Sequence, residues 1–123
     1  MNLWLCIAAL NGLLAVVSGA FAAHGLQGRV DAHALEIWEI GARYQMYHAL
    51  AMGLAAYAIR GASAGAAQVS AVCFLIGIVL FSGSLYLLAL TGVRTLGIVT
   101  PFGGLAFLIG WAALAYTATK ISL

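Results

Sequence analysis

The residues best suited to chemistry stand together in one hexapeptide, Arg43-Tyr44-Gln45-Met46-Tyr47-His48. The segment supplies a cation, two phenols, an amide and an imidazole. An arginine can hold a carboxylate or a phosphate through two hydrogen bonds, and a histidine can titrate near neutral pH or ligate a metal. The hexapeptide is followed at once by an apolar stretch. Polar groups inside a bilayer are costly unless they are paired or face water, so this segment is the first candidate for a functional site.

The composition of the chain indicates a membrane protein. Of its 123 residues, 65% are hydrophobic and 7% are charged, whereas a soluble domain has roughly 25% charged residues. Five basic residues stand against three acidic ones, for a net charge of +2, which is too little for binding nucleic acid. We therefore expect the lipid bilayer, and no nucleic acid, as a partner.

Apolar runs long enough to cross a bilayer as helices need about twenty residues. Backbone groups inside lipid must bond within their own segment, so such runs form helices rather than open strands. The sequence predicts an all-α fold, a single domain of residues 1–123 with four transmembrane helices in a compact bundle. The expected spans are residues 3–23, 44–59, 69–90 and 100–119.

An amphipathic segment is expected between the first two spans. Asp31 can cap a helix in which Glu36, Glu39 and Arg43 recur at i, i+3 and i+7, while the remaining positions are largely apolar. The segment is predicted either to lie on the lipid headgroups or to extend the second span. A binding lid is the alternative.

Small residues recur at helical spacing in the first and last spans. In lipid such faces let two helix backbones approach closely and gain dispersion contacts. They predict a tight bundle, self-association, or both. The residues concerned are Ala15, Gly19, Ala23, Gly103, Ala106, Gly110 and Ala113.

Polar residues from all four spans fall toward the same side of the membrane once this topology is imposed. Convergent polarity of this kind predicts one shared hydrogen-bond network or one vestibule. The candidate cluster consists of His24, Arg43, Tyr44, Gln45, Tyr47, His48, Ser82, Ser84, Tyr86 and Thr100.

Three interpretations of this cluster differ in what it binds. In the first it is structural, with Arg43 paired to a glutamate and His48 satisfied in the core. In the second it lines a vestibule for a small solute, a proton or a lipid headgroup. In the third, His24 and His48 ligate a haem or a metal, but no further ligand completes a metal set, so we expect neither metal nor cofactor.

An enzyme is not expected from these residues. Ser82 and Ser84 are the available hydroxyl nucleophiles within the cluster, and serine in a transmembrane helix usually bonds its own helix or a neighbour. No aspartate stands near His48 to complete a triad.

Five motifs in order along nearly the whole chain resemble the YgdD-like family of small inner-membrane proteins, related to eukaryotic transmembrane protein 256. The resemblance implies a four-span protein of the bacterial inner membrane without an established activity. Ala22 departs from the family's Gly-Ala-Phe-Gly-Ala-His, which would loosen a close contact there. The motifs are Gly19-Ala20-Phe21-Ala22-Ala23-His24, Tyr44-Gln45-x-x-His48-Ala49-Leu50, Leu80-Phe81-Ser82-Gly83-Ser84-Leu85-Tyr86, Thr100-Pro101-x-Gly103-Gly104 and Gly110-Trp111-Ala112.

The function expected from these observations is a non-enzymatic packing or assembly partner. Such a protein would form a homo-oligomer or join a larger membrane complex. The competing interpretation is the vestibule described above. On the side of the termini lie Arg60, Lys120 and the terminal amine, and on the other side lie Arg29, Arg43 and Arg94. Once Arg43 is discounted as the i+4 partner of Glu39, we expect both termini in the cytoplasm.

Overall fold

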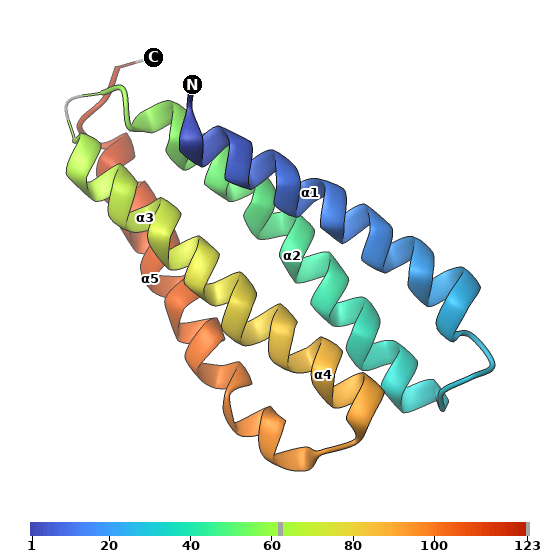
Figure 1. Ribbon diagram of the computed structural model, residues 1–123. Helices are drawn as coiled ribbons and strands as arrows, with labels where there is room; N and C mark the ends of the chain where they lie inside the picture. The colour runs from blue at the N-terminus through green and yellow to red at the C-terminus, as the bar shows by residue number, and fades with distance from the viewer. Residues whose placement is uncertain (62, 123) are drawn as a thin grey trace.

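Four helical rods joined by three turns form the computed structural model, which describes residues 1–61 and 63–122 (Figure 1). No strand occurs in this described part, where an isolated bridge between Gln27 and Val30 closes a turn. The expected all-α fold is confirmed. The elements are α1 (Leu3–Phe21), η1 (Ala22–Leu26), α2 (Ala32–Ala58), α3 (Ala64–Gly77), η2 (Ile78–Ser82), α4 (Gly83–Thr91), η3 (Arg94–Ile98) and α5 (Thr100–Ala118).

Local signals in the sequence set several of the helix ends. The side chain of Asn2 accepts a hydrogen bond from Leu5 N at 3.0 Å, and that of Asp31 accepts one from Ala34 N at 2.7 Å, so both residues act as N-caps. Gly92 ends α4 with φ 70°, a left-handed conformation that glycine adopts without steric cost.

The amphipathic segment is the first part of α2 rather than a separate helix. This helix runs without a break through its 27 residues, and at 1.5 Å per residue it is about 40 Å long. The segment therefore extends the helix that contains residues 44–59, which was one of the two expected arrangements.

Helix α2 holds the bundle together. Helix α1 packs mainly on α2, while α3, η2 and α4 form one rod that packs on another side of α2 (Figure 1). Helix α5 packs mainly on α3 and η2. The main core lies between these rods, where Met52 of α2 and Phe74 of α3 are both 0% exposed. Both chain ends lie at the same end of the bundle (Figure 1).

Three of the four rods are long and apolar enough to cross a membrane: Leu3–Leu26, Ala64–Thr91 and Arg94–Ala118. Helix α2 has sufficient length, but its first half carries Glu36 and Glu39 before the polar hexapeptide that begins at Arg43. Composition alone therefore does not mark it as a span.

The small-residue faces differ in how the structure uses them. On α5, Gly103 and Gly110 are buried, with the half-buried Ala106 and Ala113 on the same face. A Cβ on Gly103 would lie 2.4 Å from Phe81 N, and one on Gly110 would lie 2.7 Å from the Phe74 ring. This face lies against α3 and η2.

On α1 only one residue of the predicted packing face is buried. Ala15 is 4% exposed, whereas Gly19 and Ala23 are exposed, and a Cβ on Gly19 would meet nothing within 4 Å. The contact of α1 with α2 is rotated away from Gly19 and Ala23, and these two residues lie on an open surface.

Replacing Gly103 by alanine is expected to destabilise the bundle, because the new methyl group would collide with the backbone of η2. We expect a loss of about 1–3 kcal/mol in the free energy of unfolding, measured by denaturation in mixed detergent micelles. Gly104→Ala is the matched control, since a Cβ there would lie 4.0 Å from its nearest neighbour. Equal stability of the two variants would contradict the close approach.

Candidate functional site

The polar hexapeptide lies at the middle of α2 and not at the start of a helix. Gln45 is the central residue, with thirteen helical residues on either side. The segment is divided between two faces: Gln45 and His48 are buried, at 6% and 5% exposure, whereas Arg43, Tyr44 and Tyr47 are exposed. The hexapeptide is therefore two groups with different surroundings.

Gln45 links three helices through its amide. Its Nε2 donates to Asn11 Oδ1 of α1 at 3.1 Å, and its Oε1 accepts from the Tyr86 hydroxyl of α4 at 2.7 Å. Asn11 Nδ2 in turn donates to the Ile7 carbonyl oxygen at 3.0 Å. The amide oxygen and nitrogen of Gln45 thus both have partners on neighbouring rods.

His48 is held by hydrogen bonds at both ring nitrogens. The indole Nε1 of Trp111 on α5 lies 3.0 Å from His48 Nε2, and His48 Nδ1 lies 2.7 Å from the Tyr44 carbonyl oxygen. An indole N–H can only donate, so Nε2 must be the unprotonated nitrogen. Nδ1 then carries the proton and donates it to the carbonyl oxygen, which makes His48 a neutral, fully bonded imidazole.

The His48 ring is also stacked among aromatic side chains. It lies parallel to the Phe107 ring, with centroids 3.5 Å apart and planes 7° apart, and 5.6 Å from the Phe74 ring. Tyr44 packs at 4.8 Å from Phe81 on the same side. His48 therefore serves as a packing group between α2, α3 and α5 as well as a hydrogen-bonding group.

Hydroxyl groups join the rods at further points. Ser82 Oγ donates to the Gly41 carbonyl oxygen at 2.7 Å, and a Cβ on Gly41 would lie 2.9 Å from the Tyr86 ring, so α2 and the α3–η2–α4 rod approach closely here. Ser84 Oγ and Thr100 Oγ1 lie 2.6 Å apart, which joins α4 to the start of α5.

The predicted cluster is therefore a series of separate contacts rather than one chamber. In the described residues, every buried side-chain nitrogen or oxygen has a hydrogen-bond partner. His24 lies apart from the series, exposed in η1. This arrangement can hold the helices in one register, because its buried polar groups already form hydrogen bonds with one another.

The haem or metal hypothesis on His24 and His48 gains no support from this geometry. Both nitrogens of His48 are occupied by the Trp111 indole and the Tyr44 carbonyl oxygen, which leaves no lone pair for a metal ion. Within residues 1–61 and 63–122, no group of three or more histidine, cysteine or acidic side chains could hold a metal.

Three residues that form hydrogen bonds between the helices were not among the candidates from the sequence. Asn11 accepts from Gln45, Trp111 donates to His48, and Trp38 Nε1 donates to the Ser18 carbonyl oxygen of α1 at 2.8 Å. Asn11 had a detectable signal, as an amide within an apolar span. The two tryptophans had none, because their rings are as apolar as the residues around them.

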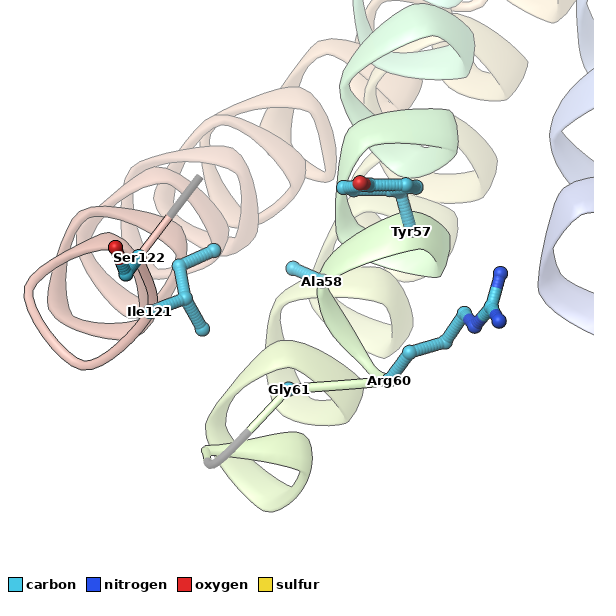
Figure 2. Close-up of a pocket in the computed structure, with 6 residues that line it drawn as sticks. All are labelled: Tyr57, Ala58, Arg60, Gly61, Ile121 and Ser122. Atoms are coloured by element: carbon cyan, nitrogen blue, oxygen red, sulfur yellow. The ribbon is translucent and has the colours of Figure 1, made fainter.

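A hollow of about 260 Å³ lies at the end of the bundle where the chain ends are (Figure 2). Tyr57, Arg60 and Gly61 border it on one side, and Ile121 and Ser122 border it on the other. Figure 2 shows the guanidinium of Arg60 extending away from Ile121 and Ser122. The polar groups do not converge, so this hollow has no arrangement suited to chemistry.

Comparison with known proteins identifies the family of this chain. A family model described as "Protein of unknown function (DUF423)" matches residues 18–104. The chain belongs to the DUF423 family. Its similarity to this family confirms the expectation of an uncharacterised family of small membrane proteins.

Relatives that are similar to almost the whole chain are also membrane proteins by name. The chain is 43% identical to the UPF0382 membrane protein SAB0533 of Staphylococcus aureus over 122 residues, covering 99% of each protein. It is 42% identical to the UPF0382 membrane protein YwdK of Bacillus subtilis, covering 98% of each. A UPF0382 membrane protein of Haemophilus influenzae is 45% identical, with coverage of 97% of this chain and 95% of the relative. No solved structure matches the chain.

Removing the Tyr86 hydroxyl is expected to destabilise the bundle, because the buried Gln45 Oε1 would lose its donor. For Tyr86→Phe we expect a loss of about 0.6–1.7 kcal/mol in the free energy of unfolding, the range of interhelical hydrogen bonds in membranes. Tyr116→Phe is the matched control, since Tyr116 is 56% exposed and lies on α5, away from this bond. Denaturation in mixed micelles measures both, and equal losses would refute a structural role for the Tyr86–Gln45 bond.

Proposed function

We propose that this chain crosses the membrane four times and serves as a non-enzymatic subunit of a membrane assembly, with the outer face of α2 as its contact surface. The partner is a second copy of the chain or another membrane protein. The observation that carries the proposal is the exposure of Arg43 at the middle of α2.

The burial of α2 supports its role as a fourth span. Its 27 residues make it about 40 Å long, more than the roughly 30 Å of the hydrocarbon core. The polar groups that lower its hydropathy are partly removed from lipid, since Gln45 and His48 bond to other helices. A helix shielded in this way crosses a bilayer without exposing its inward polar groups.

The outer face of α2 has a different character. Its exposed positions follow one another at intervals of three or four residues, so they form one continuous stripe along the helix. The stripe is charged over its first half, carries a phenol at its centre and is apolar beyond it. Its residues are Glu36, Glu39, Arg43, Tyr47, Leu50, Leu54 and Tyr57.

Arg43 is too deep in the bundle to reach water along the lipid surface. The four rods have similar lengths and lie side by side (Figure 1), so the middle of α2 lies near the middle of the bilayer. From there the interface is about 15 Å away, too far for an arginine side chain to snorkel. An arginine facing lipid at this depth costs several kcal/mol, whereas a partner helix would supply acceptors for its five N–H groups.

A second copy of the chain meets this need through residues on the same stripe. Glu39 precedes Arg43 by one helical turn, so a copy related by a two-fold axis along the membrane normal would bring the Glu39 carboxylate of one chain near the Arg43 guanidinium of the other. Tyr47 would lie between the two helices, where its ring packs and its hydroxyl finds a partner.

No catalytic step is part of this proposal, since the buried polar groups are occupied in contacts between helices. The bacterial membrane proteins among the relatives support a bacterial membrane location. We assign the chain to the inner membrane with both termini in the cytoplasm, as the basic residues near the chain ends favour.

Cysteine cross-linking in native membranes tests the contact surface. In a background with Cys6→Ala and Cys73→Ala, we expect Tyr47→Cys and Leu54→Cys to give a covalent adduct with a second chain or a partner. Leu108→Cys on α5 is the control, because it is 68% exposed but lies on another helix. Adding Arg43→Leu should weaken the adducts, since it removes the charge that needs a partner.

Two results would overturn the assembly role. One is a single-chain mass in gentle detergent together with no adduct at Tyr47→Cys above the Leu108→Cys control. The other is a solute flux or anion binding in liposomes that Arg43→Ala abolishes while the protein remains a single chain. The second result would establish the vestibule interpretation, with Arg43 and Tyr47 as its exposed groups.

A further inference from the structure

A second hollow, which bears opposite charges, lies at the other end of the bundle, away from the chain ends. It has a volume of about 570 Å³ and lies between the start of α2 and the turn from α4 into η3. Asp31, His33 and Arg94 line its polar part. None of these three residues takes part in the hydrogen-bond series around Gln45 or in the outer face of α2.

The floor of this hollow is apolar. Val30, Ile37, Leu88 and Ala89 line it, and Ala89, 6% exposed, belongs to the core cluster that also contains Trp38. The hollow is thus a depression into the side of the hydrophobic core, open at its charged rim. Water would wet the rim well and the floor poorly.

The backbone turns keep this depression in place. Gly92 is left-handed, with φ 70°, and its N–H bonds to the Leu88 carbonyl oxygen at 2.8 Å, so the chain leaves α4 sharply and Arg94 begins η3 beside the hollow. Asp31 is fixed on the opposite side as the N-cap of α2, where one carboxylate oxygen accepts from Ala34 N. A carboxylate has further lone pairs to accept a second donor.

In the proposed four-span arrangement, the hollow lies at the depth of the lipid headgroups. The start of α2 and the end of α4 lie at the same end of the bundle (Figure 1), which the proposed four-span arrangement puts at one membrane surface. A charged rim above an apolar floor at this depth matches a molecule that has a charged head and a hydrocarbon chain. The rim carries both signs of charge, which matches a head that contains an anion and a cation.

We propose that this hollow binds a zwitterionic phospholipid with a primary ammonium group. Arg94 and His33 hold the phosphodiester, since arginine binds phosphate oxygens through two N–H groups. The carboxylate of Asp31 accepts from the ammonium group, and one acyl chain lies on Ile37, Leu88 and Ala89. The site rests on the four-span part of the proposed function and is independent of the assembly role.

Native mass spectrometry of the full chain tests this assignment lipid by lipid. Delipidated protein is titrated with phosphatidylethanolamine, with phosphatidylglycerol and with inorganic phosphate, and bound molecules are counted per chain. We expect Arg94→Gln to weaken the phosphatidylethanolamine adduct about tenfold, the effect of one charge-assisted hydrogen bond. Arg29→Gln is the control, because Arg29 is an exposed arginine on the preceding turn outside the lining.

The Asp31→Asn variant separates headgroup recognition from folding. Asparagine caps a helix as well as aspartate does, so α2 should remain intact while the negative charge is lost. We expect this variant to lose its preference for phosphatidylethanolamine over phosphatidylglycerol and to keep its melting temperature. A wild-type chain with no such preference would overturn the assignment of the ammonium to Asp31.

The remaining outcomes are also decisive. Equal lipid retention by the wild type, Arg94→Gln and Arg29→Gln would overturn the site. Binding of inorganic phosphate that displaces the lipid would show that the rim takes free phosphate instead. Because bound lipids are counted per chain, a protein that retains the lipid but gives a single-chain mass and no cross-linked adduct at Tyr47→Cys would contradict the assembly role and leave this inference standing.

Discussion

The bundle depends on one constraint, the need of the buried polar groups on α2 to find hydrogen-bond partners inside the protein. Gln45 meets this need through Asn11 and Tyr86, and His48 meets it through Trp111. These bonds reach α1, α4 and α5 respectively, so each remaining rod is fixed relative to α2. Sliding any rod by one helical turn, about 5.4 Å, would leave the buried amide of Gln45 or the buried imidazole of His48 without a partner.

The same constraint divides α2 into two faces with different consequences. The inner face is complete, since the described buried polar side-chain atoms are all bonded. The outer face differs at this level of the helix, because the polar side chains of Arg43 and Tyr47 are exposed there. Helix α1 contributes to this asymmetry, since it packs mainly on one side of α2 and leaves the outer stripe uncovered. If α2 were only the polar centre of a closed bundle, the buried positions of Gln45 and His48 would be explained, but the exposed position of Arg43 would not.

Much of the fold follows from the sequence, while the site follows only in part. Apolar runs and the Asp31 cap predict the helices, and the buried Gly103 and Gly110 follow from their spacing on α5. The position of the hexapeptide in the middle of a helix does not follow from the sequence. The local pattern cannot show that the charged segment before Arg43 is already three turns of the same helix. The partners of the cluster do not follow either. Trp111 and Trp38 act through one N–H each, and their rings look like ordinary packing residues. Which small residues of the first span are buried within the single chain does not follow either, because small residues surround it on several sides. Only the shape of the neighbouring helix buries Ala15 and leaves Gly19 and Ala23 exposed.

Hydrogen bonds and close packing contribute differently to this bundle. An interhelical hydrogen bond in a membrane contributes about 0.6 kcal/mol on average, because the unfolded helices also find partners. Close contacts such as Gly110 on Phe74 and the parallel Phe107 and His48 rings add dispersion energy that is not directional. Packing therefore accounts for most of the attraction, and the polar groups select one register among several that apolar faces would allow. This division explains why Arg43 can remain exposed without disturbing the fold: the register is fixed on the inner face alone, and the charge on the outer face is available for the contact proposed above.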